Sequence, residues 1–172
     1  MSNSELVAAV YLKNRVSKGW SPLDDLTAAK PIVDDERIVL RRRLVPALAA
    51  AGPPLRAQLI PTLQKILSYD FPEKWPDFID ITMQLLNASD ASSVFAGLQC
   101  LLALCKVYRF KAGEPRGDFE KIVAVAFPQL HNIGTRLANE SSTEAGEMLR
   151  TVIKAYKHAV YVCYPKGMDL QC

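Results

Sequence analysis

Apolar residues recur along the chain at about the 3.6-residue period of an α-helix, and no stretch of strand length alternates apolar and polar residues. The pattern therefore predicts an all-α protein. The clearest helix follows Ser141-x-x-Glu144, a capping-box sequence whose side chains can satisfy free N–H groups at a helix start. Its apolar stripe consists of Ala145, Met148, Leu149, Val152, Tyr156, Ala159, Val160 and Cys163. We expect Pro165 and Gly167 to end this helix.

The same reading predicts six more helices. One covers roughly Glu5 to Lys18, and the others begin at Asp34 or Asp35, at Pro54, at Pro76, at Ser89 or Asp90, and at Asp118 as an N-cap.

Short links between these helices indicate antiparallel hairpins. Pairing the helices across the links gives hairpins at 34–69, 75–109 and 118–164, preceded by an unpaired helix within 1–20. This period is close to the ~40 residues of HEAT and armadillo repeats, so we expect an α-α superhelix over residues 1–172. Apolar residues cover nearly all sides of the first helix, which is not typical of a capping helix. We therefore expect a fragment of a longer solenoid, with 1–20 as the second helix of an incomplete repeat.

Composition narrows the class of protein. The 172 residues are 49% hydrophobic and 23% charged, which is ordinary for a globular chain. A net charge of +3 is too small to argue by itself for nucleic acid or an anionic membrane as a partner. The longest uncharged apolar run, Val94 to Cys105, has 12 residues against the ~20 that a bilayer crossing needs, so we expect no membrane span. The first residues lack the pattern of a secretory signal, which favours an intracellular protein.

Candidate catalytic groups are few. Cys100 and Cys105 fall five residues apart on a strongly apolar helix, which favours buried and unreactive thiols. His131 and His158 have no recognisable nucleophile and orienting acid nearby in the sequence. No C-x-x-C pair and no nucleotide-binding or metalloprotease motif is present. We therefore expect no metal, no cofactor and no enzyme activity.

Two segments carry more than a helical pattern. One is the stretch VYLKNRVSKGW from Val10 to Trp20, and the other is SYDFPEKWPD from Ser68 to Asp77. Together they resemble the N-terminal region of importin-β family nuclear transport receptors. The resemblance continues through DDER at 34–37 and CLLALCKVYRFK at 100–111, and it is nearest to the importin seven and importin eight branch. The export receptor for importin-α is the next nearest.

The resemblance implies a HEAT solenoid whose second helices line a concave face. In this family the N-terminal repeats of that face bind GTP-loaded Ran, which releases import cargo in the nucleus. Crevices between outer helices hold the Phe-Gly segments of nucleoporins, and the receptors work in the cytoplasm, in the nucleus and at the nuclear pore, without membrane or nucleic acid as partner. The positions that match the Ran-binding surface are Lys13, Asn14, Lys18, Arg56, Gln64, Lys65 and Asp70.

A second set of matching residues is predicted to hold neighbouring repeats together. Trp20, Phe71, Pro72 and Trp75 stand at helix junctions, where large aromatic side chains mostly pack into the core. The run Arg41-Arg42-Arg43 is expected to be solvated or to bond a loop, because successive helical residues point in different directions.

Other functions remain open at this stage. The chain could be a segment of an export receptor of the same family, or a helical-repeat scaffold that binds proteins without a GTPase. A helical hydrolase or transferase that uses Cys and His is a third possibility. RNA binding is disfavoured because aromatic residues do not recur at one position per repeat.

Overall fold

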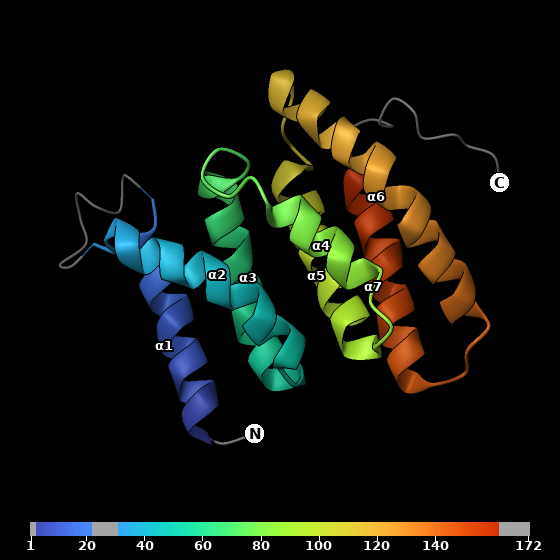
Figure 1. The fold of residues 1–172 in the computed structure, drawn as a ribbon, viewed down its shortest axis with the longest axis horizontal. Helices are drawn as coiled ribbons and strands as arrows, with labels where there is room; N and C mark the ends of the chain where they lie inside the picture. Colours follow the sequence, from blue (N-terminus) through green and yellow to red (C-terminus); the bar gives the residue numbers. More distant parts are fainter. Residues whose placement is uncertain (1–2, 22–30, 162–172) are drawn as a thin grey trace. The chain divides into compact units, whose positions relative to one another are not determined.

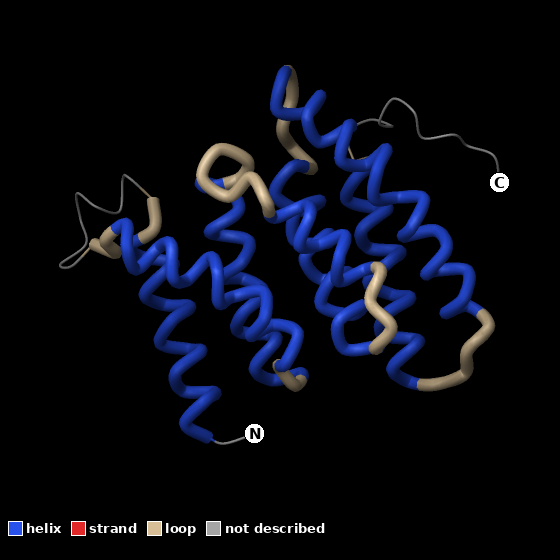
Figure 2. Tube along the Cα trace, in the orientation of Figure 1, coloured by secondary structure: helices blue, strands red, loops and turns tan. Residues whose placement is uncertain are grey.

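The computed structural model describes residues 3–21 and 31–161, and its regular secondary structure there is helical throughout (Figure 2). The helices are α1 (Asn3–Gly19), α2 (Asp34–Ala50), α3 (Pro53–Asp70), α4 (Phe78–Leu86), α5 (Ala91–Tyr108), α6 (Glu114–Ala138) and α7 (Thr143–Ala159). The prediction of an all-α fold built like a HEAT solenoid is confirmed. The predicted division into the repeats 34–69, 75–109 and 118–164 stays a prediction, although one helix pair falls in each range.

Two helix starts are fixed by side-chain caps. The Asp90 carboxylate accepts a hydrogen bond from the backbone N–H of Ser93 at 2.7 Å, as predicted for the start of α5. At α7 the cap is Ser142, whose Oγ accepts from the N–H of Ala145 at 3.1 Å. The predicted capping box at Ser141 was therefore wrong by one residue.

Other boundaries differ from the prediction. Asp118 does not cap α6, because that helix begins at Glu114 after Gly113, which has a φ of 69° that a glycine adopts without strain. Pro76 precedes α4, which begins only at Phe78. The last helix ends at Ala159, and the predicted stop at Pro165 and Gly167 lies outside the described residues.

The chain divides into two compact units, Met1–Phe78 and Ile79–Cys172. In unit 1, α1 and α3 lie side by side and run in the same direction (Figure 1). Lys13 Nζ donates to Gln58 Oε1 at 2.7 Å, and two turns further along Trp20 Nε1 donates to Asp70 Oδ1 at 3.1 Å. The helix α2 turns back onto α3 through the short link at Ala51 and Gly52.

Unit 2 repeats this arrangement. Here α5 and α7 are the parallel neighbours, as their side-chain contacts in the middle and at the C-terminal end show. Gln99 Nε2 donates to Thr151 Oγ1 at 3.4 Å, and Arg109 Nη1 lies 3.4 Å from His158 Nδ1. The helix α6 packs on α7 as its hairpin partner. The alternate helices α1 and α3 in unit 1, and α5 and α7 in unit 2, are therefore parallel, which is the order that stacked helical hairpins produce.

The core of unit 2 is organised around α5, most of whose side chains are buried. A Cβ at Gly97 would lie 2.9 Å from the backbone nitrogen of Leu86, so α4 and α5 approach closely only because this residue is glycine. By length and composition α5, with a mean hydropathy of 1.4, could cross a membrane. A membrane span was excluded from the sequence alone because the uncharged run Val94 to Cys105 has only 12 residues. That exclusion does not hold for the whole of α5. However, 67% of it is buried in the fold, as is typical of a core helix.

Candidate protein-binding surface

The predicted contact residues on α1 lie along one helix that packs on α3. Asn14 and Lys18 are exposed, whereas Lys13 is half-buried. The bond of the Lys13 ammonium to Gln58 spans from α1 to α3, so Lys13 also helps to hold the two helices together. Asn14 and Lys18 are accessible to a partner on the surface that α1 presents.

The predicted residues in the middle of α3 are only partly accessible. Gln64 and Lys65 are half-buried. The Lys65 ammonium lies 5.0 Å from the ring centroid of Tyr69, within the range of a cation–π interaction. Tyr69 itself is exposed. Lys13, Asn14, Lys18, Gln64 and Lys65 are defined here as the α1–α3 face.

Arg56 has a local structural partner. Its Nη2 donates to the backbone carbonyl of Ala51 at 2.7 Å. That carbonyl belongs to the link between α2 and α3, and Arg56 lies in the first turn of α3. The guanidinium therefore fixes the turn of the hairpin.

Asp70 lies in the interior of unit 1 and not on the α1–α3 face. Its side chain is 1% exposed, and its two oxygens are taken by Trp20 Nε1 and by Arg41 Nη1, the latter at 2.5 Å. Its backbone carbonyl accepts from the N–H groups of Lys74 and Trp75. A carboxylate that is buried and bonded in this way has a structural role, so its placement does not agree with a direct contact to a partner protein.

Arg41 and Arg37 on α2 join Asp70 and Trp20 in one buried cluster. This cluster was not predicted from the sequence. The run at 41–43 divides: Arg41 pairs with Asp70, whereas Arg42 and Arg43 are exposed. Arg37 is buried and donates from Nε to the carbonyl of Ile32 at 2.9 Å, with its Cζ 5.2 Å from the centroid of the Trp20 ring. The sequence did contain one signal of this cluster: Arg37 and Arg41 are spaced at i, i+4, which places both on one side of α2.

The aromatic residues predicted to join repeats are buried within unit 1. Trp20, Phe71 and Trp75 are between 0% and 6% exposed. The rings of Phe71 and Trp75 both meet Phe78 edge to face, at centroid distances of 6.0 and 4.9 Å. Pro72, which follows a cis peptide bond, is half-buried beside them. Their role in joining one repeat to the next stays a prediction.

The two cysteines that the structure describes, Cys100 and Cys105, are not placed to act as nucleophiles. Burial raises the pKa of both the Cys100 and the Cys105 thiol to about 12. A thiol with that pKa is almost entirely protonated at neutral pH and is a poor nucleophile. Within 3–21 and 31–161 there is also no group of three or more His, Cys, Asp or Glu residues that could hold a metal ion.

Comparison with known proteins finds relatives that are much longer than this chain. It is 28% identical over 92% of its residues to nonsense-mediated mRNA decay protein 5 of Saccharomyces cerevisiae. It is 27% identical over 94% of its residues to an importin beta-like SAD2 homolog of Arabidopsis thaliana, and 28% over 89% to importin-8 of Danio rerio. Exportin-2 of Drosophila melanogaster is 26% identical over 63% of the chain.

These matches cover 16%, 15%, 15% and 11% of the relatives, so the chain spans about a sixth of their length or less. No family model matches the chain.

Proposed function

Because this chain is a homologue of importin-β family transport receptors over about 90% of its length, we propose that it acts as a nuclear transport receptor segment that binds the GTPase Ran. Nuclear protein import is the direction we propose, with cargo proteins and Phe-Gly nucleoporins as further partners of the longer receptor. The segment would then work in the cytoplasm, in the nucleus and at the nuclear pore. The observation that carries the proposal is the match to importin-8 and to the SAD2 homolog.

The parallel packing of α1 and α3 supports the proposal. The helices α1 and α3, which carry all seven predicted Ran-binding residues, are neighbours, and the Lys13–Gln58 hydrogen bond joins them. Asn14 and Lys18 are the most accessible polar residues of the α1–α3 face. We propose that Ran contacts the α1–α3 face, and that Arg56 and Asp70 stabilise the helices that carry it through their bonds to Ala51, Trp20 and Arg41.

Transport by such a receptor depends on coupling between two ligands. If GTP-bound Ran and cargo favour different curvatures of a solenoid, each lowers the affinity of the other by the same factor. Small rotations between neighbouring hairpins can supply that change of curvature, because each hairpin contacts only its neighbours. The fold requires no catalytic residue for this function.

An export receptor of the same family is the second candidate, and the match to exportin-2 favours it. The two directions differ in the sign of the coupling, because Ran would then strengthen the binding of cargo. A protein-binding scaffold without GTPase dependence is the remaining alternative.

Binding of the 172-residue chain to immobilised Ran tests the proposal. We expect stronger retention on Ran loaded with a non-hydrolysable GTP analogue than on Ran loaded with GDP. The variant Asn14→Ala/Lys18→Glu should lose most of the retention, because it removes the exposed polar contacts of the α1–α3 face. The matched control Lys121→Glu changes an exposed lysine on α6 and should bind as the parent chain does. Equal retention on the two nucleotide forms would contradict the proposal and favour the scaffold.

A further inference from the structure

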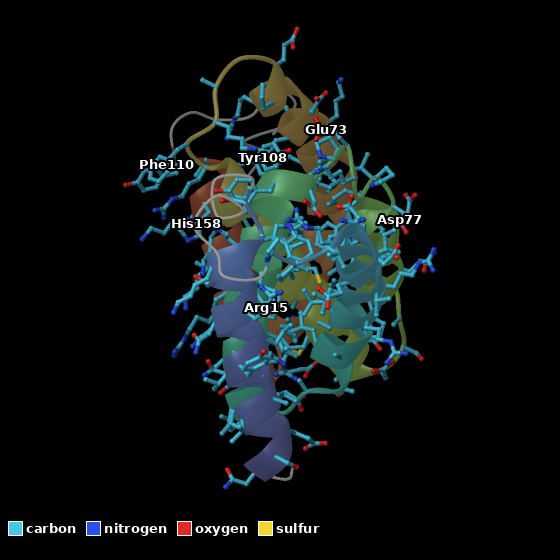
Figure 3. The ribbon with its side chains drawn as sticks, turned by 90° about the vertical axis from the view of Figure 1, so that its left-hand side faces the viewer. Arg15, Glu73, Asp77, Tyr108, Phe110 and His158 are labelled. Carbon is cyan, nitrogen blue, oxygen red and sulfur yellow. The ribbon has the colours of Figure 1, made fainter. Side chains whose placement is uncertain are left out.

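Five basic side chains meet where α5 and α7 end. Lys106 and Arg109 come from the end of α5, and Lys154, Lys157 and His158 come from the last turns of α7. Because the two helices are parallel, these ends lie together, and Arg109 Nη1 is 3.4 Å from His158 Nδ1. We define these five residues as the α5–α7 basic face. Figure 3 labels one of them, His158, together with Phe110, which follows Arg109 in the sequence, and both lie on the same side in that view.

The helices that form this face bring no negative charge to it. No Asp or Glu lies within α5, and the acidic residues of α7, Glu144 and Glu147, precede Lys154 by two turns or more. The pKa of Lys106 is lowered by burial and by the charges of Lys154 and Arg109. Like charges held this close repel one another, and a bound anion would relieve the repulsion.

Two aromatic rings position the Arg109 guanidinium at this face. Its Cζ lies 4.2 Å from the ring centroid of Phe110 and 5.3 Å from that of Tyr161. The two rings meet edge to face at 5.3 Å, and both are more than half exposed. Stacking on Phe110 uses the flat face of the guanidinium, and its N–H groups other than the one beside His158 can still bind a carboxylate.

We propose that the α5–α7 basic face binds an acidic peptide segment, rich in Asp and Glu, on a partner protein. Arg109 would bind one carboxylate, and Lys106, Lys154 and Lys157 would pair with its neighbours along the peptide. The aromatic side chains of Phe110 and Tyr161 would border the bound segment. This proposal does not rest on Ran binding, because its residues lie in unit 2 and the α1–α3 face lies in unit 1.

Charge alone would also suit a nucleic acid, but the aromatic residues favour a peptide. Single-stranded nucleic acids bind by stacking bases on open aromatic faces. Here the Arg109 guanidinium already lies over both the Phe110 and the Tyr161 ring. A carboxylate needs only the edge of that guanidinium, whereas a base would have to displace it.

Fluorescence anisotropy with a labelled peptide of alternating Asp and Glu, added to the full chain at low and at physiological salt, tests the proposal. We expect saturable binding that weakens as the salt concentration rises. The variant Lys154→Glu/Lys157→Glu should weaken it by roughly tenfold or more, since each charged hydrogen bond contributes on the order of a tenfold change in affinity. Both lysines are exposed, so the variant should fold, and circular dichroism checks this.

The matched control is Arg42→Glu/Arg43→Glu, which makes the same charge change at exposed positions of α2. Unchanged peptide affinity in this control, with loss in the α7 variant, supports the proposal. Equal loss in both variants would overturn it, because binding would then follow net charge only. Tighter binding of a single-stranded RNA oligonucleotide of the same length, or no saturable peptide binding by the parent chain, would overturn it as well. Neither result depends on whether the chain retains Ran.

Discussion

Trp20 Nε1 donates a hydrogen bond to Asp70 Oδ1 across 3.1 Å, and both side chains are almost completely buried. The pair joins the end of α1 to the end of α3, 50 residues later. The second carboxylate oxygen of Asp70 accepts from Arg41 on α2. One carboxylate therefore ties together α1, α2 and α3.

Replacement of Asp70 by alanine should destabilise unit 1 strongly. It leaves the Trp20 N–H and the Arg41 guanidinium without their acceptor in the interior, and breaking a buried ion pair costs about 3 kcal/mol or more. Urea denaturation followed by tryptophan fluorescence measures the loss in the free energy of unfolding.

The control for this prediction is Asp118→Ala. Asp118 pairs with Lys121 at 2.8 Å, but both side chains are more than half exposed. Exposed pairs contribute little to stability because water and salt screen them. Similar losses in the two variants would show that Asp70 has no special role in the fold.

Gly97→Ala should destabilise unit 2 by about 2 kcal/mol. The added methyl group would lie 2.9 Å from the backbone nitrogen of Leu86 and 3.1 Å from Leu85 Cβ, so α4 and α5 would have to move apart. The midpoint of thermal unfolding gives the effect. Gly146→Ala, where nothing lies within 4 Å of the new Cβ, should instead stabilise α7 by about 0.5–1 kcal/mol. The sign of the change therefore separates close packing from helix propensity, and a stabilised Gly97 variant would refute the close approach.

The positions of the helices could be predicted from the sequence because apolar periodicity, prolines and caps are local signals. They placed Asp90 correctly, but they failed at Ser141, where the adjacent Ser142 is the cap, and at Asp118, where the helix begins earlier, at Glu114 after Gly113. The contacts of polar residues across helices could not be predicted, because they depend on which helix faces which. Asp70 was predicted among the Ran-binding positions, and only the packing of α1 and α2 on α3 reveals that it is buried. The α5–α7 basic face was missed for the same reason, since its α5 residues lie 45 or more positions before its α7 residues along the chain.

Cys100 and Cys105 should react with thiol reagents only after the chain unfolds. With a pKa of about 12, each thiol is roughly one part in 10⁵ thiolate at pH 7, and each is also buried. The experiment uses a Cys163→Ser/Cys172→Ser background, which leaves these two thiols as the reporters, and compares labelling with and without urea. Fast labelling of either thiol in the native chain would revive the hypothesis of a cysteine-dependent enzyme.

His158 should make stability depend on pH. Burial, then the positive charges of Arg109, Lys106, Lys157 and Lys154, lower its pKa below the ordinary value of about 6.5. Between the two pKa values the unfolded chain binds more protons than the folded one, so the stabilisation is present above about pH 6.5 and is lost as the pH falls below it.

Thermal unfolding of His158→Gln measured between pH 5 and pH 8 checks this expectation. As the pH falls, the stability of the variant should decrease less than that of the parent chain. His131→Gln, at an exposed position on α6, is the control and should follow the parent chain. Parallel curves for all three proteins would contradict the assigned surroundings of His158.

The parallel packing of α1 with α3 and of α5 with α7 has a consequence for how a protein of this kind can change its length during evolution. Each of these pairs joins helices separated by a single intervening helix, so the contacts between them span about 50 residues and not the length of the chain. A gene encoding this plan can gain or lose a two-helix module by duplication or deletion without disturbing the pairing elsewhere. Lengthening by tandem copying is thus the easiest evolutionary route open to this architecture.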